Sequence, residues 1–266
     1  WRMKFNMARN WNRFEKSYSG KDVVDGDGTL LVVGRPLNGL YVWAHRGYYN
    51  SDAEVPRLYK IDGQEIYFNG VATNGISGAV GDYRLLDLDG DGNPDSYYAG
   101  SPLPLAHGGW VNELMWKNFD LNVLVNFTIG RKMINNRMGL GFSRQSEDGH
   151  LTKLFDYRKL RPWDGVNKKP NAPAWGNSLS MNTDSAIEKV HHLALKQITL
   201  GYNLPDRISK KAGLSGVRFF LTAENLFYLS NYSGGNPEVV NIYTGRDNGD
   251  TYPLPRKYTL GLTLNF

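Results

Sequence analysis

Four aspartates in a short glycine-containing segment form the sharpest chemical motif of the sequence. Asp87, Asp89, Asp91 and Asp95 occupy positions 1, 3, 5 and 9 of the run DLDGDGNPD. Calcium takes six to eight oxygen ligands in a flexible geometry, and carboxylates at this spacing on a tight loop can supply them. Position 12 of the same run is Tyr98, where a complete calcium-binding loop carries a bidentate glutamate. The motif therefore predicts either a Ca²⁺ site that stiffens a surface loop or a solvated Asp/Gly turn.

The other residues that could carry chemistry do not form a catalytic pattern. The sequence contains no cysteine, which excludes thiolate nucleophiles, disulfides and cysteine-bound metals. Its five histidines lack HExxH spacing, and no Gly-x-Ser-x-Gly element offers a nucleophile elbow. His191 and His192 stand next to each other before a predicted strand, so they point to opposite faces and do not chelate one ion together. We expect a protein that is not an enzyme.

Binding chemistry is better represented, because aromatic residues make up 13% of the chain. Aromatic rings beside Asn, Asp and Arg suit sugars and peptide backbones, since the rings stack on CH-rich faces while polar groups bond to hydroxyls or amides. Many of these aromatic residues would instead pack loops or line a membrane interface. Trp163 and Trp175, in the segment 156–180, are the candidates for contact with a ligand or with a covering partner protein.

The elements that must position these residues are β-strands, because the dominant hydrophobic period is two. A turn at Lys117-Asn118 is followed by a strand whose alternate residues are apolar over 119–127. Between 193 and 204 the apolar phase changes, which predicts a β-bulge near Lys196-Gln197. A short helix is predicted over 205–213. Further predicted strands cover residues 1–7, 30–33, 40–48, 217–224 and 258–266.

Long irregular segments (49–109, 130–190 and 228–256) separate the strands. Such loops are uncommon in compact soluble domains, but a membrane barrel has short turns at one rim and long loops at the other. No apolar run approaches the roughly 18 residues of a spanning helix, whereas a spanning strand is only half apolar. A soluble sandwich would show the same alternation, with its apolar faces inside. Charged residues make up 21% of the chain with a net charge of +5, which is too mixed for a nucleic-acid partner.

The two ends of the chain add to this picture. Thr259, Gly261, Leu264 and Phe266 form a polar-x-Gly-x-x-apolar-x-aromatic pattern that ends on the last residue. It resembles the signal by which bacterial outer-membrane barrels are recognised for assembly, since an exposed alternating strand can pair edge to edge with the assembly machine. The alternative is an ordinary sandwich strand that ends in phenylalanine. The opening WRMKFNM already alternates, so we expect further domains and a targeting signal upstream.

Five segments follow one another in a recognisable order. The run LALKQITLGYNLPDRISKKAGLSGVRFFLTAENLFYLSNYSGGNPE (193–238) has a Leu-Gly-Tyr-x-Leu-Pro element, a helical turn and a strand ending in Asn-Leu-Phe. The chain closes with YPLPRKYTLGLTLNF (252–266). Upstream lie VGRPLNGLYVWAHRGYYNSDAEV (33–55), GDYRLLDLDGDGNPD (81–95) and the hairpin around 116–121. Together these segments resemble the SusC/RagA family of TonB-dependent outer-membrane transporters.

The resemblance implies an all-β fold, a transmembrane antiparallel β-barrel. Residues 1–266 would form the C-terminal portion of a plugged 22-stranded barrel with long extracellular loops, and the plug and the TonB-binding segment would lie outside this chain. It implies active import of oligosaccharides or peptides across the bacterial outer membrane. The implied partners are a SusD-like surface lipoprotein, the TonB complex, the upstream barrel and plug segment, and the lipid bilayer. A soluble all-β carbohydrate-binding module and a non-transporting outer-membrane scaffold are the alternatives.

Overall fold

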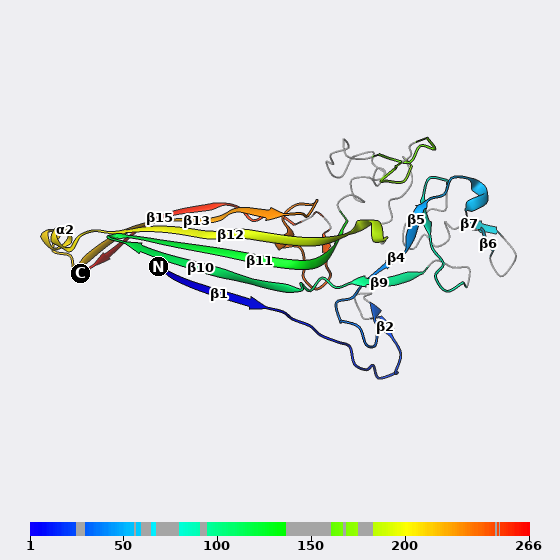
Figure 1. Cartoon of the computed structure of the whole chain (residues 1–266), viewed down its shortest axis with the longest axis horizontal. Helices are drawn as coiled ribbons and strands as arrows, with labels where there is room; N and C mark the ends of the chain where they lie inside the picture. Colours follow the sequence, from blue (N-terminus) through cyan, green and yellow to red (C-terminus); the bar gives the residue numbers. More distant parts are fainter. Residues whose placement is uncertain are drawn as a thin grey trace.

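Strands dominate the computed structural model, which describes residues 1–24, 30–55, 57–59, 65–67, 80–90, 95–136, 161–166, 169–174, 183–247, 249 and 251–266 (Figure 1). The long strands are β1 (Arg2–Ala8), β10 (Ala106–Trp116), β11 (Phe119–Asn135), β12 (Ile187–Asn203), β13 (Gly216–Ser230) and β15 (Lys257–Asn265). The short strands are β2 (Val23–Val24), β3 (Leu30–Leu31), β4 (Leu40–Trp43), β5 (His45–Tyr48), β6 (Arg57–Tyr59), β7 (Glu65–Tyr67), β8 (Tyr83–Leu85), β9 (Ser96–Gly100) and β14 (Arg246–Asp247). The helical elements are η1 (Asp52–Glu54), η4 (Asp184–Ala186), α2 (Asp206–Ser209), η5 (Lys210–Ala212) and η6 (Pro237–Val239). None of the helices in these ranges has the length and apolar character needed to cross a membrane.

The six long strands form one antiparallel sheet in the order β1-β10-β11-β12-β13-β15, and β14 pairs in parallel with the end of β11. At one end of the sheet the connections are short, and both chain termini lie there (Figure 1). One connection is the two-residue turn Lys117-Asn118, and the other is α2 with η5, which ends at Gly213 in the left-handed conformation. At the opposite end the strands are joined by the segments 9–105, 136–186 and 231–256. The predicted hairpin turn, the helix over 205–213 and the asymmetry between the two ends are confirmed.

A β-bulge interrupts the pairing of β11 with β12, as the change of apolar phase predicts. Leu124 pairs with Gln197, whereas Val125 pairs with Leu195, so Lys196 is the extra residue. The pairing of β12 with β13 also shifts between Leu195 and Gln197. Because successive strand residues point to opposite faces, one extra residue returns the apolar side chains on both sides of the bulge to the same face.

The predicted loop boundaries near 130–190 need correction, because β11 continues to Asn135 and β12 begins at Ile187. Alternation is lost there for a physical reason: both faces of the sheet are covered. Ile134 packs with Leu40 in one buried cluster, and Met133 packs with Tyr232 in another. A strand that is buried on both faces is apolar at consecutive positions and does not show a period of two. The predicted strand over 40–48 is likewise divided into β4 and β5, and the segment 49–109 contains β6 to β9 and the start of β10.

The long sheet has one largely apolar face, on which Asn112 of β10 is a polar exception. Its register aligns leucines across five strands, in the row Leu114, Leu121, Leu200, Leu221 and Leu260. These side chains are not covered: 45% of Leu200 and 48% of Leu221 is exposed, although both lie in interior strands. Soluble monomers rarely expose apolar patches larger than a few hundred Å². We refer to this surface as the outward face and to the opposite surface as the polar face.

Candidate functional site

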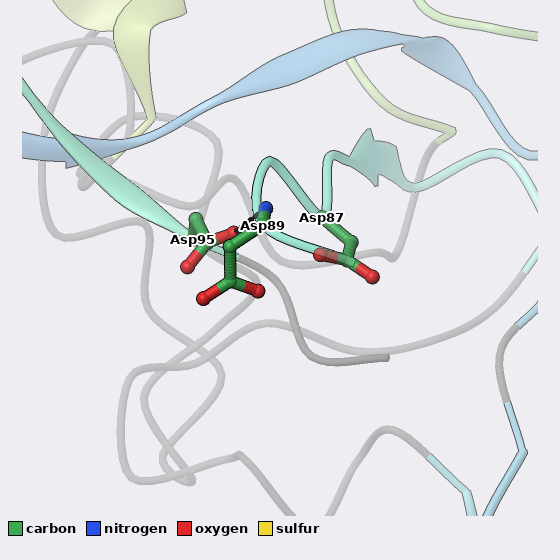
Figure 2. Close-up of side chains that lie close together, drawn as sticks. All are labelled: Asp87, Asp89 and Asp95. Carbon is green, nitrogen blue, oxygen red and sulfur yellow. Dashed lines mark hydrogen bonds between the residues drawn. The ribbon is translucent and has the colours of Figure 1, made fainter. Parts of the chain in front are cut away.

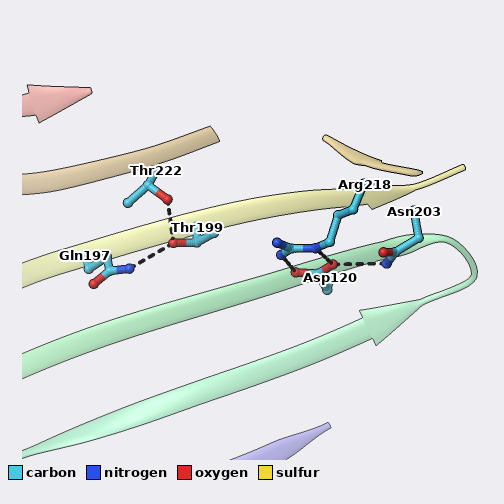
Figure 3. Close-up of polar contacts among 6 residues, drawn as sticks. All are labelled: Asp120, Gln197, Thr199, Asn203, Arg218 and Thr222. Atoms are coloured by element: carbon cyan, nitrogen blue, oxygen red, sulfur yellow. Dashed lines mark hydrogen bonds and ion pairs between the residues drawn. The ribbon is translucent and has the colours of Figure 1, made fainter. Parts of the chain in front are cut away.

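The polar face carries charges in hydrogen-bonded pairs. Near the short turns, Arg218 of β13 reaches across β12 to Asp120 of β11 (Figure 3). Its Nη2 donates to Asp120 Oδ2 at 2.6 Å and its Nε donates to Oδ1 at 3.2 Å, while the Asn203 amide donates to Oδ1 at 3.2 Å. The strand between them carries Gly201, whose missing side chain leaves room for this contact. Such a two-bond pairing fixes the guanidinium against the carboxylate.

Further hydrogen bonds between side chains lie in the middle of the polar face, and they join both neutral and charged groups. The hydroxyls of Thr199 and Thr222 lie 3.0 Å apart, and Gln197 donates to Thr199 at 3.0 Å (Figure 3). Nearer the other edge of the sheet, Lys4 of β1 donates to Glu113 of β10 at 2.8 Å. Each long strand places at least one charged or amide side chain on this face, which is typical of a surface that faces water.

The segment 231–247 folds back over the polar face near the end of the sheet that carries the long connections. The buried Arg131 side chain holds it, since Nη1 donates to the Pro237 carbonyl at 3.2 Å and Nη2 donates to the Val240 and Asn241 carbonyls at 2.9 Å. Lys196, the bulged residue of β12, lies 3.3 Å from the Glu238 carboxylate. The bulged residue thus forms an ion pair that links this segment to the sheet.

A polar cleft of about 530 Å³ remains between this segment and the sheet. Its floor contains a row of side chains in register, with His107 opposite Thr128 and Thr128 opposite His192. Asn6 and Asn126 line the next part of the floor. The Nδ1 atoms of both histidines are buried without a hydrogen-bond partner among the described residues. Imidazole, amide and hydroxyl groups that converge in one cleft can bind a ligand rich in amides or hydroxyls.

The sequence alone does not indicate this row, because His107 is distant in the chain from His191 and His192 and no known ligand spacing joins them. His191 and His192 do lie within a strand, so they point to opposite faces as predicted. Only the pairing of β10, β11 and β12 brings His107 and His192 together on the polar face. Counting alternate positions back from Leu193 and Trp110 could have assigned both histidines to that face, but not to one cleft.

Three of the predicted calcium ligands do come together. The carboxylate oxygens of Asp87, Asp89 and Asp95 lie within 4.8 Å of one another (Figure 2). Backbone amides of Leu88 and Gly90 donate to Asp95 and Asp87 at 2.6 Å, which orders the turn. An all-oxygen donor set of this kind fits Ca²⁺. Asp91 lies outside the described residues, and the calcium site stays a prediction.

Of the two tryptophans predicted to contact a ligand or partner, Trp163 lies within the described residues. Trp163 is half-buried; its indole Nε1 donates to Asn50 at 3.3 Å, and its ring packs on the backbone of Gly81. These contacts tie together two connections at the long-loop end, 9–105 and 136–186. Trp175 lies outside the described residues. Both remain predicted ligand or partner contacts.

A second polar cluster joins the same two connections. His45 Nδ1 contacts the Asp184 carboxylate, and the Tyr97 hydroxyl donates to Asp184 Oδ2 at 3.1 Å. Burial raises the pKa of the Tyr97 phenol, and the neighbouring Asp184 carboxylate raises it further. Burial likewise raises the pKa of Tyr83, whose ring lies edge-on to His45 with centroids 4.6 Å apart. Both phenols therefore remain protonated at neutral pH, and the Tyr97 hydroxyl keeps its hydrogen bond to Asp184, which ties the two connections together.

The proposed assembly-signal residues lie on β15 and just after it. Thr259 pairs with Thr222, and Gly261 leaves space for the ring of Phe220 on the polar face. Leu264 and Phe266 belong to the outward face, and 92% of Phe266 is exposed. β15 pairs with β13 on one side only within the described residues. The four residues stay a predicted assembly signal.

Comparison with known proteins gives consistent matches along the whole chain. TonB-dependent receptor P26 of Formosa agariphila is 31% identical over 291 residues, covering 100% of this chain and 27% of the relative. TonB-dependent receptor P3 of the same organism is 26% identical over 290 residues, with coverages of 100% and 27%. TonB-dependent receptor SusC of Bacteroides thetaiotaomicron is 27% identical over 279 residues, with coverages of 100% and 24%. The chain spans about a quarter of the length of these curated relatives. No family model matches it.

Solved structures agree on the fold. The RagAB peptide transporter superposes with a TM-score of 0.68 at 23% identity, covering 99% of this chain and 27% of that chain. The RagAB peptide importer in the "open-open" state superposes with a TM-score of 0.67 at 21% identity, covering 99% of this chain and 26% of that chain. The fold is thus that of a β-barrel wall, of which this chain is one portion. Within that class the chain is SusC/RagA-like, since the relatives that it matches over its whole length are TonB-dependent receptors.

Proposed function

We propose that this chain forms part of the wall and the extracellular loops of a bacterial outer-membrane transporter that imports oligosaccharides or peptides. The observation that carries the proposal is the exposed apolar face that runs across six antiparallel strands, opposite a polar face with paired charges. Lipid would cover the outward face, and the polar face would line the water-filled interior. The names of the relatives, SusC and other TonB-dependent receptors, and of RagAB, a peptide transporter, support it and describe no enzyme.

The proposed transporter would have two protein partners. A SusD-like surface lipoprotein would sit over the long connections 9–105, 136–186 and 231–256, which all emerge at one end. The TonB complex would act through an N-terminal plug segment outside this chain. The cleft under the segment 231–247 would contact the substrate, because its histidine, asparagine and threonine side chains offer both donors and acceptors.

The alternative of a soluble carbohydrate-binding sandwich needs a second layer over the outward face. Near the long-loop end, Leu40 and Val42 of β4 provide such cover for Ile134. Nearer the short turns, the described part of the chain provides no second layer over this face, and Leu221 is half exposed. The distribution of exposed leucines therefore favours lipid over a protein core. A barrel that served only as a scaffold would not need a cleft lined by hydrogen-bonding groups for a ligand.

Growth of a strain that lacks the complete receptor gene tests the proposal. We expect the deletion to abolish growth on one class of oligosaccharide or peptide, and the wild-type gene to restore it. The cleft variant Asn126→Ala/Thr128→Ala should restore growth only partly, whereas Thr263→Ala, on the same face but distant in register, should restore it fully. Unimpaired uptake of every oligosaccharide and peptide would favour the scaffold. A receptor that is monodisperse in buffer without detergent would contradict the membrane assignment.

A further inference from the structure

The outward face changes from apolar to basic at one level of the sheet. On β1 the alternate positions read Met3, Phe5, Met7 and then Arg9 just beyond the strand. On β12 the apolar Leu193 is followed, four residues closer to the long connections, by Lys189. On β11 the apolar series ends at Ile129, and Lys132 follows after a register shift. Three strands of the sheet (β1, β11 and β12) therefore place a cation just beyond the apolar band, although they are separated in the sequence.

These cations line a cleft of about 540 Å³. Arg9, Lys132 and Lys189 contribute three positive charges, and Trp11 and Tyr98 contribute aromatic rings. Among the described residues that line this cleft there is no aspartate or glutamate. The guanidinium of Arg35 lies 4.9 Å from the centre of the Tyr98 ring and adds a fourth cation beside it. The cleft differs in this respect from the polar face, where cations such as Lys4 have carboxylate partners.

The positive charge of this cleft is not compensated by the described part of the chain. Lys132 and Lys189 stand directly opposite each other in the register of β11 and β12, and like charges in that position destabilise a sheet. The Lys132 ammonium donates to the Ala99 carbonyl, which orients it without neutralising it. No described carboxylate lies within ion-pair distance of Arg9, Lys132 or Lys189. An anion bound between them would relieve the repulsion.

The surroundings indicate where the anion comes from. The cleft opens directly above the apolar outward face, and Leu105 and Ile129 are exposed beside it. Trp11 has 78% of its surface exposed at the rim, where tryptophan is enriched in membrane proteins because it suits the headgroup level. Lysine and arginine side chains at this level reach toward headgroup charges. A soluble anion would have no contact with the apolar surface below the cleft.

We propose that this cleft binds the phosphate-bearing headgroup of a lipid in the outer leaflet, whose acyl chains lie along the outward face. The inference rests on the proposed function in one respect, that the outward face meets lipid. It goes beyond it by assigning Arg9, Lys132 and Lys189 to a specific lipid site outside the transport path.

Native mass spectrometry of the complete receptor, purified in detergent, tests the site. The probes are phosphatidic acid and diacylglycerol with the same acyl chains, which differ only in the phosphate. We expect one phosphatidic acid to be retained where diacylglycerol is not. Changing Arg9, Lys132 and Lys189 to glutamine together should weaken this retention on the order of 100-fold, from about 5-fold per cation. Inorganic phosphate at the same concentration should not displace the lipid.

The matched control removes three cations from the opposite rim, in the variant Arg207→Gln/Lys210→Gln/Lys211→Gln. It should retain phosphatidic acid like the wild type. Equal retention by the cleft variant, or displacement by inorganic phosphate, would overturn the lipid site while leaving a detergent-dependent membrane protein. Failure of the proposed function would look different, because the receptor would then be soluble without detergent and would retain neither lipid.

Discussion

An arginine placed on the outward face should be far more damaging than one placed on the neighbouring polar position. Val123 and Asn122 are adjacent in β11 and point to opposite faces. Val123 lies halfway between Phe119 and Phe127, two residues of the outward face that are roughly 26 Å apart along the strand at about 3.3 Å per residue. A strand tilted by about 40° therefore places Val123 near the middle of the bilayer, where arginine costs about 2–4 kcal/mol.

The expected result is a loss of roughly 30- to 700-fold in the folded-to-unfolded ratio for Val123→Arg, since each 1.4 kcal/mol is a factor of about ten. Asn122→Arg should change the ratio by less than about twofold, because its side chain meets water near Glu113, its partner in the register. The assay is urea unfolding of the complete receptor in lipid vesicles, followed by the mobility of the folded barrel on gels without heating. Equal damage from both variants, or greater damage from Asn122→Arg, would refute the assignment of the two faces.

Three further predictions concern particular contacts. The double-mutant cycle of Asp120→Asn and Arg218→Gln should give a coupling of about 1 kcal/mol in the same unfolding assay, and a coupling of zero would show that this half-exposed pair does not stabilise the wall. Ca²⁺ should slow proteolysis near residue 89 in the wild type but not in Asp89→Asn, and equal cleavage rates with EDTA and with Ca²⁺ would argue for a simple turn. Asn225 has a φ of 51°, and its side-chain oxygen accepts a hydrogen bond from Lys196 at 2.8 Å. Asn225→Ala should therefore destabilise the fold by about 1–2 kcal/mol, and Asn225→Gly by less, because glycine adopts positive φ without strain. The reverse order in urea unfolding would contradict the importance of this backbone conformation.

The long strands could be predicted from the sequence because their two faces meet different surroundings. In β11 the alternation from Phe119 to Phe127 indicates both the strand and the face that is apolar. The bulge at Lys196 was also predictable, since one extra residue is the simplest way for a single strand to change its apolar phase. The ends of the strands were not, because Met133 and Ile134 are buried on opposite faces by segments distant in sequence.

The candidate site was less accessible to sequence reasoning than the fold. The Asp87–Asp95 motif is local, so the closeness of three of its carboxylates follows from spacing alone. The cleft with His107 and His192 depends on the register of three strands, and the basic cleft around Lys132 depends on where β1 ends relative to β12. A single sequence contains the alternation but not the pairing partners, and therefore it does not place these residues side by side.

Cysteine scanning along β12 tests the central claim most directly, because this chain contains no cysteine of its own. Single cysteines at 193–202 in the complete receptor would carry a fluorophore that is quenched either by nitroxide lipids or by an aqueous quencher. We expect lipid quenching at Leu193 and Leu195 and then, after the bulge at Lys196, at Ile198, Leu200 and Tyr202, with aqueous quenching at the intervening positions. Alternation that continues through Lys196 without a change of phase, or aqueous quenching on both faces, would contradict a lipid-facing barrel wall.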